Sequence, residues 1–106
     1  MAGVSEPASA YQARIEEATI IETLNGGLWL QLFLAGFRQE ARELFTAGYR
    51  IEHLLLTVAD DPADRTQEQR DLEVTFRAEW VRQIERARKL LAEQIHGEAA
   101  LALAQA

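Results

Sequence analysis

The stretch that decides the fold is FLAGFRQEARELFTAGYRIEHLLL, residues 33–56. Its apolar residues recur every three or four positions, the spacing that places side chains on one face of an α-helix. No segment of the chain alternates between polar and apolar residues as a half-buried strand would. We therefore predict an all-α fold. The apolar stripe of this helix should consist of Phe33, Phe37, Leu44, Ile51, Leu55 and Val58.

A short N-terminal helix is predicted before this stretch. Ser9 and Gln12 have the spacing of a capping box, in which two side chains satisfy free N–H groups at a helix start. The Asn-Gly-Gly triplet at 25–27 contains residues that adopt the left-handed conformation of a helix C-cap. The first helix should therefore cover residues 9–24.

Two long helices should follow and form an antiparallel hairpin. The first is expected over residues 28–58 and the second over 66–96. Thr66 and Gln69 form another capping box at the start of the second, and Gly97 can end it. The apolar stripe of this last helix should comprise Phe76, Trp80, Ile84, Ala87, Leu91 and Ile95.

The domain organisation follows from these helices. Residues 1–8 form a flexible lead-in, 9–97 a single helical domain and 98–106 an Ala-rich C-terminal tail. Two long helices cannot enclose a core, so we expect the hairpin to dimerise into a helical bundle. The segment LWLQLFL is apolar on nearly all sides, which suits burial by a second copy or docking of a different partner. The expected partner or oligomer interface contains Trp29, Leu30, Phe33, Phe37 and Trp80.

Composition restricts the classes of function. Charged residues make up 26% of 106 residues and carry a net charge of −6, so nucleic acid and anionic membrane surfaces are not expected partners. The chain contains no cysteine, which excludes disulfides and thiolate ligands and favours the cytoplasm. The N-terminus lacks the pattern of a signal peptide, and no apolar run is long enough to cross a bilayer.

Four charged residues lie on the predicted inner faces: Glu22, Glu40, Glu73 and Arg77. Burying an unpaired charge costs several kcal/mol. Pairing of Glu73 with Arg77 one turn away is favoured, whereas we expect Glu40 to find an arginine across an oligomer interface. The same four residues could alternatively form a polar pocket for a small ligand.

A weak metal signal is present near the end of the last predicted helix. Glu93 and His96 have the Glu-x-x-His spacing of di-metal carboxylate bundles, and Glu52 with His53 could supply further ligands. These residues point away from the predicted core, so a site would need an oligomer interface. Surface histidines are the more ordinary interpretation.

The leading functional hypothesis is a non-enzymatic helical interaction protein, acting as a homodimer or higher homo-oligomer on a protein partner without a cofactor. No phosphate-binding loop or nucleophile–histidine pair points to an enzyme. The alternative is a bundle that binds a small ligand or a di-metal centre. Mimicry of nucleic acid by the acidic surface is a weaker third hypothesis.

Overall fold

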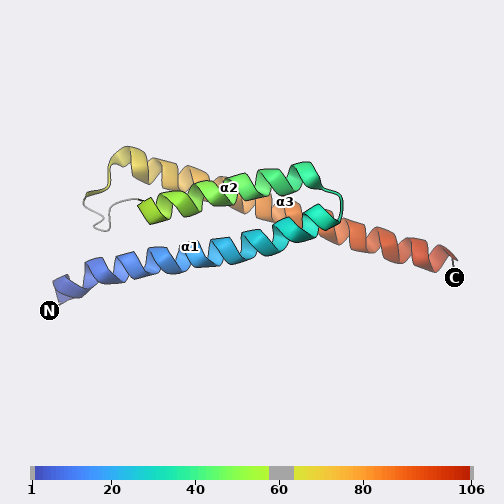
Figure 1. Cartoon of the computed structure of the whole chain (residues 1–106), viewed down its shortest axis with the longest axis horizontal. Helices are drawn as coiled ribbons and strands as arrows, with labels where there is room; N and C mark the ends of the chain where they lie inside the picture. Colours follow the sequence, from blue (N-terminus) through green and yellow to red (C-terminus); the bar gives the residue numbers. More distant parts are fainter. Residues whose placement is uncertain (1, 58–63, 106) are drawn as a thin grey trace.

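The computed structural model describes the backbone of residues 2–57 and 64–105, which contain three α-helices and no strand. Helix α1 spans Ala2–Leu34, α2 spans Arg38–Thr57 and α3 spans Gln67–Gln105. Successive helices run in opposite directions, with α2 packed against both neighbours (Figure 1). The all-α prediction is confirmed. Side chains are described for residues 11–57, 64–95, 97–98 and 101–105.

Helix α1 does not follow its predicted bounds. It begins at Ala2 instead of Ser9, and it continues through 25–27 to Leu34. A glycine inside a helix costs about 1 kcal/mol relative to alanine, which packing against a neighbouring helix can outweigh. The predicted stop at 25–27 is therefore wrong. The backbone of residues 2–8, predicted to be a flexible lead-in, is helical.

The true break lies at Gly36, which has a positive φ of 93°. The N–H of Phe37 donates to the carbonyl of Leu32 at 2.9 Å, and the N–H of Gly36 donates to the carbonyl of Phe33 at 3.1 Å. This pair of hydrogen bonds is the Schellman motif, and its usual apolar contact is supplied by Leu32 and Phe37, which belong to one core cluster. The predicted helix over 28–58 is consequently split between α1 and α2.

The start of α3 is the one predicted from the sequence. The N–H of Gln69 donates to Thr66 Oγ1 at 3.0 Å, and the N–H of Thr66 donates to Gln69 Oε1 at 2.9 Å, so the capping box is confirmed. The end is not, because α3 passes Gly97 and continues to Gln105. The alanines and leucines that follow Gly97 are strong helix formers, so one glycine does not end the helix.

The core consists of two clusters stacked along the bundle. Leu32, Ala41, Leu44, Ile84 and Ala87 form the cluster near the α1–α2 turn, and Ala18, Ile21, Ile51 and Leu55 form the other. Trp80 packs against both clusters. Burial is confirmed for Leu44, Ile51, Leu55, Ile84 and Ala87.

Two members of the predicted stripes are exposed. Phe33 is 41% exposed because it lies on the outer side of α1, and Ile95 is 65% exposed because it lies beyond the core. Val58 falls outside the described residues.

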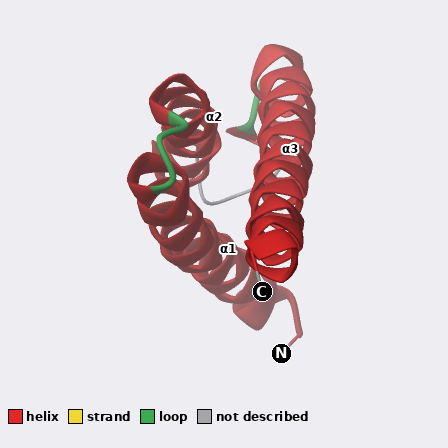
Figure 2. Cartoon of the chain, turned by 90° about the vertical axis from the view of Figure 1, so that its right-hand side faces the viewer, coloured by secondary structure: helices red, strands yellow, loops and turns green. Residues whose placement is uncertain are grey.

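The three helices form an elongated body of 68 × 27 × 16 Å. Seen from its end, α1 and α2 lie together on one side and α3 on the other (Figure 2). Leu90 and Leu91 pack beside the cluster at the α1–α2 turn, so residues 92–105 project past that turn for about 20 Å (Figure 1). Over the residues that the structure describes, none of the helices carries an apolar stretch long enough to span a membrane.

Candidate interaction surface

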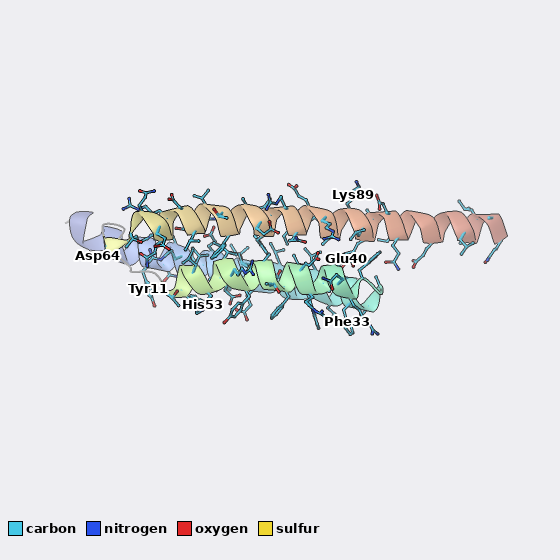
Figure 3. The ribbon with its side chains drawn as sticks, turned by 90° about the horizontal axis from the view of Figure 1, so that it is seen from above. Tyr11, Phe33, Glu40, His53, Asp64 and Lys89 are labelled. Atoms are coloured by element: carbon cyan, nitrogen blue, oxygen red, sulfur yellow. The ribbon has the colours of Figure 1, made fainter. Side chains whose placement is uncertain are left out.

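An aromatic surface covers the side of α1 and α2 that faces away from α3. We call it the aromatic face, and it comprises Trp29, Phe33, Arg38, Arg42, Phe45 and Tyr49. On α2 these residues recur every three or four positions, so they form one stripe on the side opposite the core. Phe33 and His53, labelled in Figure 3, point to this side, whereas Glu40 lies between α2 and α3.

Three of the four rings on this face are exposed, and Trp29 is half-buried against the core. Trp29 and Phe33 stack with centroids 5.4 Å apart, and the guanidinium of Arg38 lies 5.3 Å from the Phe33 centroid. Phe45 is 53% exposed and Tyr49 is 57% exposed. A groove of about 380 Å³ opens between Trp29, Phe33, Arg38, Arg42 and Phe45.

Exposed tryptophan, tyrosine and arginine are the residue types that carry most binding energy in protein interfaces. The large rings bury apolar area, and the guanidinium groups pair with carboxylates on a partner. Sequence reasoning identified Trp29 and Phe33 but missed Phe45 and Tyr49. Their signal was the spacing 38, 42, 45, 49 on the polar side of an amphipathic helix.

A second apolar surface lies between α1 and α3. We call it the aliphatic groove; it encloses about 430 Å³ and its lining includes Ile20, Leu24, Trp80 and Val81. Ile20 is 58% exposed and Val81 is 42% exposed. The groove exists because α1 and α3 contact each other much less than either contacts α2. It lies on a different side of the molecule from the aromatic face.

The five predicted interface residues have different positions in the fold. Trp29, Leu30 and Phe33 are accessible near the α1–α2 turn. Phe37 belongs to the Schellman turn and packs on the core. Trp80 is half-buried, and its indole N–H donates to Asn25 Oδ1 at 3.2 Å.

Asn25 joins all three helices. It is 5% exposed, accepts the Trp80 hydrogen bond from α3, and donates from Nδ2 to the carbonyl of Phe45 on α2 at 3.4 Å. Gly48 lies directly beneath it: a Cβ at residue 48 would be 2.7 Å from Asn25 Oδ1 and closer still to Cγ and Nδ2. The asparagine predicted to end a helix is therefore an internal link in the core.

The predicted pairing of Glu73 with Arg77 is present, with Arg77 Nη2 2.9 Å from Glu73 Oε1. Arg77 also makes two hydrogen bonds to Glu17 on α1, at 2.6 and 3.2 Å, and Arg65 lies 3.1 Å from Glu73. The hydrogen bonds that Arg77 donates to the Glu17 carboxylate, above all, raise the pKa of Arg77. This network ties α1 to α3 next to the aliphatic groove.

Glu40 finds an arginine within its own chain. Its carboxylate lies 3.9 Å from Arg86 on α3, and Arg86 also pairs with Glu43 one turn further along α2. Hydrogen bonds from Gln39 and then Arg86 lower the pKa of Glu43. The expectation that Glu40 needs an oligomer interface overlooked Arg86, because within the chain only Arg77 was considered as a partner and Arg86 lies outside the predicted apolar stripe of α3.

Glu22, predicted to face inward, is exposed on α1. Burial raises the pKa of Glu52 on α2, and the negative charge of the nearby Glu22 raises it further. Glu22 and Glu40 are about ten residues apart along the antiparallel α1–α2 pair, roughly 15 Å. The four residues of the predicted polar pocket therefore do not meet in one place.

The predicted metal ligands are also separated within one chain. Glu52 and His53 lie near the end of α2, whereas Glu93 lies on the part of α3 beyond the α1–α2 turn. The side chain of His96 is outside the described residues. Among the side chains that are described, no three histidine, cysteine, aspartate or glutamate residues come together as a metal site.

Comparison with known proteins adds no relative. The chain matches no protein-family model, no curated protein and no solved structure at a significant level.

Proposed function

We propose that this chain is a non-enzymatic helical interaction protein, an adaptor, regulator or assembly factor, that works as a homo-oligomer in the cytoplasm. The observation that carries the proposal is the aromatic face, where stacked and exposed rings are bordered by arginines outside the core. Isolated exposed apolar residues are normal in folded proteins, but a contiguous group of this composition is typical of a binding surface.

The chemistry of this face suggests its partner. Arg38 and Arg42 border a groove lined by aromatic rings, in a chain whose net charge is −6. A local cationic rim on an acidic protein favours a partner segment that carries carboxylates beside aliphatic side chains. Each guanidinium can form a bidentate ion pair with a carboxylate of the partner. An acidic amphipathic helix of another protein has this chemistry.

Self-association is the second part of the proposal. The aliphatic groove lies on a different side of the molecule from the aromatic face, so a second copy and a different partner can bind at the same time. A small single chain buries only about two thirds of its surface, and a shared interface would cover the remaining apolar area.

Partner binding is tested by capture from the host lysate with three variants, followed by titration of the purified captured protein. We expect Phe45→Ser and Arg42→Glu to weaken binding on the order of thirtyfold, the effect of losing about 2 kcal/mol at a hot spot. Leu34→Ser is the matched control, because Leu34 is 75% exposed near the same turn but on another side of α1. Equal binding by all three variants, or loss only in the control, would refute the role of the aromatic face.

Self-association is tested separately by sedimentation equilibrium of the purified chain over a wide concentration range. We expect a homo-oligomer at micromolar concentration. A monomer at every concentration would remove this part of the proposal.

A further inference from the structure

Helix α3 carries a second apolar seam that the fold of one chain does not use. We call it the outer seam, and it comprises Val74, Ala78, Val81, Glu85, Arg88, Ala92 and Ile95. These residues alternate in steps of four and three, the heptad spacing of helices that pair along their length. All seven are exposed, with Val74 at 67% and Ile95 at 65%. The buried residues Ile84 and Ala87 lie on an adjacent face of α3.

We propose that the outer seam binds α3 of a second copy in the antiparallel direction, with Glu85 opposite Arg88 of the second copy. The proposal deepens the homo-oligomer of the proposed function by naming the helix, the direction and the register. By two-fold symmetry, Arg88 also lies opposite Glu85 of the second copy, so the dimer contains two copies of this ion pair.

Charge complementarity supports this register. Neither Glu85 nor Arg88 has an ion-pair partner among the residues that the structure describes, whereas the nearby Arg86 pairs with Glu40 and Glu43. A flanking cation, Arg82, is already paired with Glu79 on its own helix. The two central charges of the seam are therefore available to each other, and only the antiparallel direction places opposite signs face to face.

Side-chain size supports the same register independently. Moving outward from the central pair, Val81 lies opposite Ala92 of the second copy, and Ala78 lies opposite Ile95. Each layer thus combines one large and one small residue, which lets two helices pack closely along their length. A shift by one heptad would place both charges against apolar residues.

The arrangement also fills the aliphatic groove. The groove is bordered on α3 by Val81 and on α1 by Ile20 and Leu24. In this register the end of α3 that projects past the α1–α2 turn, residues 92–105, lies along that border in the second copy. The projecting end therefore gains a binding surface, and the groove gains a helix of matching apolar character.

Charge reversal tests the register directly, with sedimentation equilibrium and native mass spectrometry as measurements. Glu85→Arg and Arg88→Glu each create two like-charge contacts across the interface, so we expect each variant alone to dimerise on the order of a hundredfold more weakly. An equimolar mixture of the two variants should form a heterodimer, and the double variant Glu85→Arg/Arg88→Glu should form a homodimer again. Both positions are exposed, so circular dichroism should show unchanged helix content.

The matched control is Glu22→Arg, which makes the same change of charge as Glu85→Arg at an exposed position on α1. It should dimerise as the wild type does. If Glu85→Arg and Arg88→Glu dimerise as strongly as the wild type, or if mixing the two variants does not restore dimerisation, the outer seam is not the interface, although self-association itself stands. A wild-type chain that is monomeric throughout would overturn both.

Discussion

The close contact between Asn25 and Gly48 offers a sharp test of how the three helices are held together. Asn25 bonds to Trp80 on α3 and to the Phe45 carbonyl on α2, and Gly48 leaves no room for a Cβ beneath it. In an ordinary helix, Gly→Ala stabilises a protein by about 1 kcal/mol. At residue 48 we expect the opposite sign.

The magnitude follows from what the new methyl group displaces. A Cβ at residue 48 would force the Asn25 side chain to move, which breaks both of its hydrogen bonds at about 1 kcal/mol each. Overpacking adds about 1 kcal/mol, and the helix propensity of alanine offsets about 1 kcal/mol. Gly48→Ala should therefore lower the free energy of unfolding by about 2 kcal/mol.

A double-mutant cycle isolates the contact. Asn25→Ala alone should lower the free energy of unfolding by about 2–3 kcal/mol, because two hydrogen bonds are lost and a cavity forms. In that background the methyl group has room, so adding Gly48→Ala should raise stability by up to about 1 kcal/mol. The coupling energy between the two sites is then about 3 kcal/mol, the upper end for residues in contact.

Urea unfolding followed by far-ultraviolet circular dichroism measures these differences, at one fixed protein concentration because self-association shifts the midpoint. Gly26→Ala is the matched control: Gly26 lies one residue from Asn25 in α1, and a Cβ there meets nothing within 4 Å. The control should stabilise the chain by about 1 kcal/mol. If Gly48→Ala also stabilises it, or if the two mutations are additive, the reasoning about Asn25 is wrong.

Three further predictions concern the turn, one ion pair and one partly buried carboxylate. Gly36→Ala should lower the free energy of unfolding by about 1–2 kcal/mol in the same urea assay, because alanine is strained at a φ of 93°. Arg77→Gln should destabilise by about 1 kcal/mol and by less in 1 M salt, since the ion pair with Glu17 is partly exposed; an effect independent of salt would contradict it. Burial, and then the charge of Glu22, raise the pKa of Glu52, so ionisation of Glu52 opposes folding. The protonated form of Glu52 therefore favours the folded state at acidic pH, and this stabilisation is lost as the pH rises through the raised pKa. Glu52→Gln should therefore melt at a higher temperature than the wild type at pH 7 and at the same temperature near pH 3.5, and a lower melting temperature at pH 7 would refute the assignment.

The candidate surfaces could be predicted only in part from the sequence. Trp29 and Phe33 stood out because their segment is apolar on nearly all sides, so some of that surface had to remain exposed. Phe45 and Tyr49 did not stand out, because an aromatic residue on the polar side of a helix has the same local pattern whether it is isolated or adjacent to rings on another helix. Only the packing of α1 beside α2 brings Trp29, Phe33 and Phe45 together around one groove.

Local hydrogen bonding explains which helix ends could be predicted. The capping box at Thr66 and Gln69 was predictable because both partners are three residues apart and need no tertiary contact. The end of α1 was not, because several glycines compete as C-caps and the local sequence does not rank them. Gly36 ends the helix where Leu32 and Phe37 can both reach the core.

The sequence by itself determined the helical class, the core stripe of α2 and the pairing of Glu73 with Arg77, because each depends on spacing along a single helix. The tertiary structure alone decided where α1 turns, that Asn25 is a buried link and that Arg86 is the partner of Glu40. Those outcomes depend on which turns of different helices lie level with one another. A shift of a few residues at one turn changes every such neighbour while leaving the pattern within each helix unchanged.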